Sequence, residues 1–122
     1  MKRNILLGTY HKTGTVWMYN VFLAIAKEFK VPFYYVSKHT HFYQTELKTE
    51  EGRAEFLKKK GENPDGSIIF DDQTNFALIP ESLHNSFTGF RVIRDPVSVV
   101  CSAAKYHTWS EEGWLHKPMH KF

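Results

Sequence analysis

The 122-residue sequence is poor in cysteine, in charge of one sign and in long apolar runs, and each shortage excludes a class of protein. A single cysteine, Cys101, excludes a fold held together by internal disulfides. The formal net charge of +3 suits an anionic small molecule but is too weak and too dispersed to indicate nucleic acid. No run reaches the roughly 18 apolar residues of a membrane-spanning helix, and no signal peptide is recognisable. We therefore expect a cytoplasmic protein without a membrane span.

The composition is that of one globular domain, residues 1–122. Hydrophobic residues make up 42% of the chain and charged residues 24%, which is ordinary for such a domain. Aromatic residues reach 16% and cluster at 33–35, 42–43 and 106–114. Cys101 stands among valines and alanines, so we expect it to be a small core residue.

Short apolar runs alternate with segments of helical periodicity. We expect four strands, at residues 4–9, 33–36, 67–70 and 90–93. We expect helices at 15–31 and 49–60, a short helix at 80–86, and a further helix with Asp95 as N-cap and Pro96 as its first residue. This alternation predicts an α/β fold, a three-layer α/β/α arrangement around a parallel sheet.

The loop after the first predicted strand has the features of an anion site. It leads directly into the N-terminus of the first helix, where free backbone N–H groups and the helix dipole favour an anion. Lys12 adds a positive charge, and Gly14 removes a Cβ from the path of a ligand. Thr13 and Thr15 add hydroxyl donors.

The position of the lysine separates this loop from a nucleoside-triphosphate P-loop, in which lysine directly follows the last glycine. Here Lys12 precedes Gly14, and Thr15 follows it. Trp17, on the first helical turn, offers a flat face on which a purine can stack. The alternative interpretation is a tight turn with a packed tryptophan and a solvated lysine.

A second candidate anion site lies at the end of the fourth predicted strand. Arg94 stands at its carboxyl end, the edge where open α/β sheets bind ligands. Ser98 and Ser102 are four residues apart on the following helix and therefore share one face of it. An arginine with serine hydroxyls beside it can hold a phosphate. In the alternative interpretation Arg94 pairs with Asp95, and the serines cap the helix or face solvent.

Together the two stretches resemble the signatures of the sulfotransferases that use 3′-phosphoadenosine 5′-phosphosulfate (PAPS) as donor. The first signature of that family, close to T-Y-P-K-S-G-T-T-W, is similar to residues 9–17, T-Y-H-K-T-G-T-V-W. The second is an arginine, then Asn or Asp, then proline, with a serine eight residues after the arginine; it is similar to Arg94, Asp95, Pro96 and Ser102. The resemblance covers most of the chain and implies a P-loop NTPase-like sulfotransferase fold.

The resemblance also implies a role for each matched residue. Lys12 would stabilise the charge that develops on the bridging oxygen as the sulfuryl group leaves, and Arg94 and Ser102 would hold the 3′-phosphate. The remaining donor contacts, with Trp17 stacked on adenine, would come from the loop residues His11, Lys12, Thr13, Gly14, Thr15, Val16 and Trp17. Because one donor must touch both stretches, we expect the first and fourth strands to be neighbours in the sheet.

Three positions depart from the family pattern. His11 stands where the family has proline, Val16 replaces a common threonine, and Ser98 stands where many members have aspartate. The loss of the threonine hydroxyl removes one donor contact. The change at His11 loosens the loop but removes no donor.

The residue that takes the proton of the acceptor is the least determined part of the site. Many members of the family carry a histidine just after the third strand, where this chain has Gln73, which cannot accept a proton at neutral pH. Asp72, or Asp71 before it, is our candidate for the general base. The alternative role of these carboxylates is to cap the turn at 76–79.

Three histidines are candidates for the acceptor pocket. His39 and His41 follow the second strand and point to the same side if the chain is extended there. A metal site would need further ligands, and the other histidines are scattered, so we expect no metal. We place both residues, with His107, in the pocket wall; His107 has an alternative role in contacts of the C-terminal segment.

These features predict transfer of a sulfuryl group from PAPS to a hydroxyl or amine of a small molecule or glycan, with 3′-phosphoadenosine 5′-phosphate (PAP) as product. The glycine-rich and basic loop that closes over the 3′-phosphate in the family has no counterpart, so we expect the chain to lack the C-terminal part of the fold. The alternative is a reduced form of the fold that binds the donor weakly. Two other functions remain open, a P-loop nucleotide phosphotransferase and a non-catalytic nucleotide-binding module. The sequence does not define the acceptor or the oligomeric state.

Overall fold

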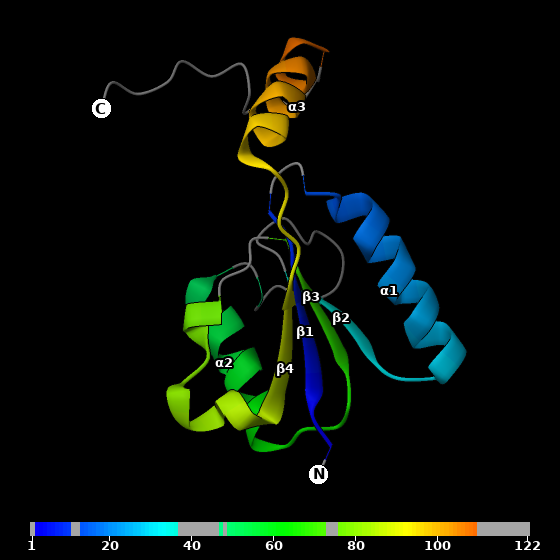
Figure 1. Cartoon of the computed structure of the whole chain (residues 1–122). Coiled ribbons are helices and arrows are strands. Elements are labelled where there is room, and N and C mark those ends of the chain that lie inside the picture. The colour runs from blue at the N-terminus through cyan, green and yellow to red at the C-terminus, as the bar shows by residue number, and fades with distance from the viewer. Residues whose placement is uncertain (1, 11–12, 37–46, 48, 73–75, 110–122) are drawn as a thin grey trace.

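Figure 1 shows the chain as a computed structural model, which describes residues 2–10, 13–36, 47, 49–72 and 76–109. Its centre is a sheet of four parallel strands in the order β2-β3-β1-β4. The strands are β1 (Asn4–Gly8), β2 (Phe33–Val36), β3 (Ile68–Asp71) and β4 (Phe87–Arg91). The helices are α1 (Thr15–Phe29), α2 (Glu50–Glu62), α3 (Pro96–Trp109) and the short 3-10 helices η2 (Phe76–Leu78) and η3 (Glu81–Ser86). The predicted α/β fold with a parallel sheet is confirmed.

β1 lies in the interior of the sheet, paired with β3 on one side and β4 on the other. Gly8 lies opposite Asp71 of β3 and Arg91 of β4. The pairing continues past the strand ends, because Thr9 N–H donates to the Asp71 carbonyl and Val92 N–H to the Gly8 carbonyl, both at 3.0 Å. The predicted adjacency of the first and fourth strands is confirmed, and the loops that follow them start from one edge of the sheet.

β4 begins at Phe87, three residues before the predicted start at Phe90. Phe87 packs in the core and is 9% exposed, whereas Phe90 is 51% exposed and Ile93 lies beyond the strand. The prediction of a strand at 90–93 is therefore wrong in its bounds. The apolar run is a poor guide here because β4 is an edge strand, where an apolar side chain is not necessarily covered.

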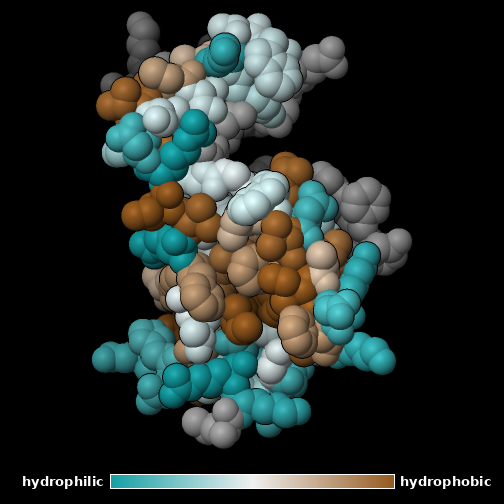
Figure 2. Space-filling model, turned by 45° about the vertical axis from the view of Figure 1, so that its right-hand side comes forward, coloured by the Kyte–Doolittle hydropathy of each residue, from teal (hydrophilic) through white to brown (hydrophobic). Residues whose placement is uncertain are grey.

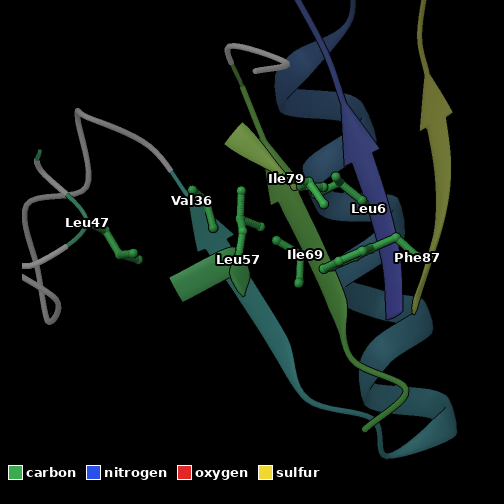
Figure 3. Packing of buried hydrophobic residues seen from close by; sticks show 7 residues of the cluster. All are labelled: Leu6, Val36, Leu47, Leu57, Ile69, Ile79 and Phe87. Carbon is green, nitrogen blue, oxygen red and sulfur yellow. The ribbon is translucent and has the colours of Figure 1, made fainter. Parts of the chain in front are cut away.

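Helices lie on both faces of the sheet (Figure 1). On one face α2 contributes to a buried apolar cluster, whose members are Leu6, Val36, Leu47, Leu57, Ile69, Ile79 and Phe87 (Figure 3). On the other face α1 packs through Tyr19, whose ring centroid lies 5.3 Å from that of Tyr35 and 5.6 Å from that of Phe70. Because both faces are covered, β3 is buried along its whole length, as is usual for a parallel strand.

Parts of α1 and α3 keep apolar side chains exposed. Ala26 is buried in α1, but Phe29 on the same helix is 72% exposed. α3 protrudes beyond the carboxyl edge of the sheet (Figures 1 and 2), and Cys101 on this helix is exposed. The expected core position of Cys101 is therefore wrong, because the helix extends away from the sheet instead of packing across it. Within the described residues, no helix combines the length and the apolar character that crossing a membrane requires.

The amino edge of the sheet is held by one buried side chain, that of Asn4. Its Nδ2 donates to the Lys60 carbonyl at 2.8 Å, and its Oδ1 accepts from the backbone N–H groups of Asp65, Gly66 and Ser67, each at 3.2 Å. Gly66 supplies the positive φ of 80° that this turn requires. Asn4 thus ties the start of β1 to the end of α2 and to the turn before β3.

An ion pair flanks this anchor. Lys60 Nζ lies 2.8 Å from Asp65 Oδ2 and 4.1 Å from the centroid of the Tyr34 ring. Partial burial opposes ionisation of Asp65, but hydrogen bonds from Lys60 and Ser67 outweigh it and lower the pKa of this carboxyl to about 2. The carboxylate therefore keeps its charge throughout the neutral and mildly acidic range.

Replacement of the anchor, Asn4→Ala, should lower the free energy of unfolding by about 3 kcal/mol, because the part-buried N–H groups of Asp65 and Gly66 lose their Asn4 acceptor and the Lys60 carbonyl loses its Asn4 donor. Urea denaturation at neutral pH measures the change. The matched control is Asn20→Ala, since Asn20 is exposed and donates only to the carbonyl one turn before it in α1; its effect should stay within about 0.5 kcal/mol. Equal effects of the two substitutions would contradict the anchoring role.

Candidate functional site

The loop between β1 and α1 ends in an uncapped helix N-terminus. Gly14 is the N-cap residue of α1 and has φ 82° and ψ 33°, the left-handed conformation, and no side chain caps the helix there. The Met18 N–H donates to the Gly14 carbonyl at 2.9 Å and closes the first turn. The N–H groups of Thr15, Val16 and Trp17 therefore have no partner within the helix. They form the positive end of the helix dipole. Such an end favours an anion.

Gly14 is required by its backbone conformation and not by crowding. A Cβ added at this position would meet no atom within 4 Å. Its positive φ is a conformation that most residues adopt only at a cost. The sequence interpretation, in which glycine leaves room for a ligand, is compatible with this open space.

The threonine hydroxyls of the loop take part in hydrogen bonds within it. Thr13 is 8% exposed, and its Oγ1 accepts from the Tyr10 N–H and donates to the Tyr10 carbonyl, both at 2.8 Å. Thr15 Oγ1 donates to Thr9 Oγ1 at 3.0 Å. These contacts fold the loop against the end of β1. In this arrangement the threonine hydroxyls are used within the loop. The donors available to an anion here are the backbone N–H groups in the first turn of α1.

The other two α-helices in the described part of the chain begin with a side-chain cap. Thr49 Oγ1 accepts from the Gly52 N–H at 3.0 Å at the start of α2, and Asp95 Oδ2 accepts from the Ser98 N–H at 2.9 Å at the start of α3. The predicted cap role of Asp95 is confirmed. α1 alone among these three helices lacks a side-chain acceptor at its start.

The loop before α1 and the β4–α3 connection share a hollow of about 340 Å³. Its lining residues come from both loops and from the start of α3: Tyr10, Thr13, Ile93, Arg94, Pro96, Val99 and Val100. The two stretches that the sequence marked as anion sites thus both contribute to this hollow, the first through Thr13 and the second through Arg94. The lining as a whole is mainly apolar.

The other predicted donor-binding residues that the structure describes are not among those that line this hollow. Val16 and Trp17 are 75% and 68% exposed on the first turn of α1, so the Trp17 ring is accessible for stacking. Ser98 and Ser102 are half-buried on α3 and are not among the residues that line the hollow.

The two carboxylates at the end of β3, those of Asp71 within the strand and Asp72 just after it, follow the strand that pairs with β1. Asp71 is 5% exposed, and its carbonyl accepts the Thr9 N–H bond described above. Asp72 is half-buried, and its Oδ2 accepts a hydrogen bond of 2.7 Å from the Tyr35 hydroxyl. The turn at 76–79 is closed by its own backbone, from the Ile79 N–H to the Phe76 carbonyl at 3.1 Å.

Several predicted site residues lie outside the described residues: His11, Lys12, His39, His41 and Gln73. His107 belongs to α3, but its side chain is outside the description. Within the described part of the chain, no three His, Cys, Asp or Glu side chains come together as metal ligands.

Two side chains near the site escaped the sequence analysis, Tyr35 and Arg91. The guanidinium carbon of Arg91 lies 5.6 Å from the Tyr10 ring centroid and 5.3 Å from that of Phe76, within cation–π range. Arg91 is the last residue of β4, but the predicted strand at 90–93 placed it near the start of that strand, so its position at the carboxyl end was not apparent. Tyr35 had no comparable signal, because its contact with Asp72 joins residues 37 positions apart.

We compared the chain with protein-family models, with curated proteins and with solved structures, and none of the three comparisons found a match. The function is therefore inferred from the residues and their geometry. The resemblance to PAPS-dependent sulfotransferases comes from the two sequence signatures alone.

The conformation of Gly14 generates a prediction about the loop. Gly14→Ala should destabilise the protein by roughly 1–2 kcal/mol, because alanine must adopt the left-handed conformation. Gly14→Asn should cost less, since asparagine tolerates that conformation better. Urea denaturation of the three proteins provides the comparison. A wild-type stability for Gly14→Ala would show that the residue does not need its positive φ.

Proposed function

We propose that this chain binds PAPS and transfers its sulfuryl group to a hydroxyl or amine of a small-molecule or glycan acceptor. The observation that carries the proposal is the shared hollow, which is lined by Tyr10 and Thr13 of the loop before α1 and by Arg94 of the β4–α3 connection. Among the three α-helices in the described residues, α1 is the one that starts without a side-chain cap. The two signature stretches are far apart in sequence, and a single donor with two anionic ends requires both. The finer fold assignment, a P-loop NTPase-like sulfotransferase fold, is part of the same proposal.

The donor has three groups for which the chain offers partners. The 5′-phosphosulfate suits the N–H groups at the start of α1, with Lys12 as the added charge. The 3′-phosphate suits the Arg94 guanidinium, and Ser102 is the second partner that the resemblance implies. The adenine suits the accessible face of Trp17.

The reaction is an in-line displacement at sulfur. The acceptor oxygen or nitrogen forms a bond to sulfur while the bond from sulfur to the bridging oxygen of the phosphosulfate breaks. The electron pair of that bond stays on the bridging oxygen, which becomes a phosphate oxygen of PAP, and Lys12 stabilises its charge. The acceptor proton passes to a base, for which Asp72 is the candidate. Positioning and charge stabilisation then supply most of the rate.

The two alternative functions require different residues. A P-loop phosphotransferase requires a lysine directly after the last glycine, and this chain has Thr15 there. A non-catalytic nucleotide-binding module requires only donor binding, and Gln73 at the family's histidine position favours it. Binding and turnover measured side by side separate this module from the enzyme.

Ligand preference tests the donor site. PAP should bind at least about tenfold more tightly than AMP, because Arg94 is matched to the 3′-phosphate. Arg94→Ala should bring the two affinities close together. The control is Arg3→Ala, since Arg3 is exposed just before β1, at the opposite edge of the sheet. Calorimetry with both nucleotides measures the ratio, and equal affinities in the unsubstituted protein would remove the sulfotransferase proposal.

Substitution of Lys12 tests the chemistry. Lys12→Ala should reduce turnover by roughly 100-fold or more while changing donor affinity far less, because the charge on the bridging oxygen grows only as the S–O bond breaks. Lys12→Arg should restore little, since a planar guanidinium does not reproduce the point charge. Lys59→Ala, an exposed lysine on α2, is the matched control and should leave turnover unchanged. Normal turnover of Lys12→Ala with a panel of phenols, alcohols and amines would refute the role.

A further inference from the structure

One hydrogen bond connects the candidate base to a neighbouring strand. The Tyr35 hydroxyl donates to Asp72 Oδ2 at 2.7 Å, a short bond to a carboxylate. Tyr35 belongs to β2 and lies opposite Phe70 of β3, two residues before Asp72. The tyrosine side chain therefore extends along the sheet towards its carboxyl edge and meets the carboxylate there.

The ring of Tyr35 is fixed by aromatic packing. Its centroid lies 5.3 Å from that of Tyr19 on α1 and 5.6 Å from that of Phe70 on β3. Tyr19 also meets Phe70 and Phe33 edge to face, so that the four rings form one cluster beneath α1. A ring held in this way brings its hydroxyl to a defined position, because the side chain has few other orientations without loss of these contacts.

The carboxylate that receives this bond stands beside the donor loop. Asp72 follows Asp71, whose carbonyl accepts the N–H of Thr9 at 3.0 Å, and Thr9 begins the loop that leads to Lys12. Asp72 is also half-buried, so its orientation depends on protein contacts more than that of a fully exposed carboxylate would. The hydrogen bond from Tyr35 of β2 is one of the contacts that orient this carboxylate.

We propose that Tyr35 is a positioning residue for sulfuryl transfer, which holds the Asp72 carboxylate in the orientation that accepts the acceptor proton. The inference rests on the proposed function, in which Asp72 is the base. The bond formed is from the acceptor atom to sulfur, the bond broken is from sulfur to the bridging oxygen, and the proton moves from the acceptor to Asp72. Tyr35 keeps its own proton and takes part only through its hydrogen bond to the carboxylate.

The positioning role predicts a kinetic effect of the Tyr35 hydroxyl that a purely structural role does not predict. A base misaligned by a small distance loses rate without loss of substrate affinity, because alignment matters most in the transition state. The hydroxyl of Tyr35 should therefore affect kcat and not KM. Its effect should also disappear when Asp72 can no longer accept a proton, because residues that act as a unit are not additive.

A double-mutant cycle tests the proposal, with Tyr35→Phe, Asp72→Asn and the combined variant. Turnover with PAPS and a panel of phenols, alcohols and amines is measured beside PAP binding by calorimetry. Tyr35→Phe should lower kcat about tenfold and leave KM and PAP affinity within about twofold. Asp72→Asn should lower kcat by roughly 100-fold or more. The combined variant should turn over no more slowly than Asp72→Asn alone.

The matched control is Tyr19→Phe, which removes a hydroxyl from the same ring cluster and keeps the ring itself. It should retain turnover within about twofold, and thermal unfolding of all variants checks that they fold. A tenfold loss on adding Tyr35→Phe to the Asp72→Asn background would overturn the positioning role, as would wild-type turnover of Tyr35→Phe.

Failure of the underlying function has a different signature. If the unsubstituted chain does not prefer PAP over AMP, the donor assignment fails and the role of Tyr35 fails with it. If it binds PAP with that preference but turns over none of the acceptors, the chain is a non-catalytic binding module and Tyr35 is a structural residue. Only donor preference, turnover and a non-additive cycle together support the inference.

Discussion

The parallel pairing of β1 with both β3 and β4 is the constraint on which the candidate site depends. Because β1 lies between these strands, the strand ends at Gly8, Asp71 and Arg91 are held side by side. The loop before α1, Asp72 after β3 and the β4–α3 connection therefore start from one edge of the sheet, where open α/β sheets bind ligands. A shift of register by one residue would turn the apolar side chains of a strand away from the core. Burial of those side chains thus fixes the geometry of the site.

The polar groups at the two edges of the sheet differ in their contacts. At the amino edge, Asn4 is buried and uses its polar atoms on α2 and on the turn before β3. This anchor sets the register of β1 against β3 before the strand reaches the loops. At the carboxyl edge lie the start of α1, the exposed Arg94 and the half-buried Asp72. Because Asn4 holds the amino edge together, the polar groups at the carboxyl edge are not required for that anchoring.

Features that depend on neighbouring residues in the chain could be predicted from the sequence. Features that depend on the surroundings in the folded structure could not. The β1 strand, the cap at Asp95 and the helix after Thr15 follow from short patterns, and the structure has them. The start of β4 and the exposure of Cys101 were predicted wrongly, because an apolar pattern does not reveal that a strand is at an edge or that a helix protrudes. The contact between Tyr35 and Asp72 joins two strands and has no local pattern at all.

The starts of α1 and α3 differ in the groups that they offer to an anion. At the start of α3 the Asp95 carboxylate accepts the Ser98 N–H, so a negative charge already occupies the positive end of that helix. A second anion near this point needs a cation from a side chain, and Arg94 is the residue that the β4–α3 connection places at the hollow. At the start of α1 no side-chain acceptor is present, so backbone N–H groups can serve an anion directly. Two anionic groups of one ligand can then be held by one helix end and one guanidinium.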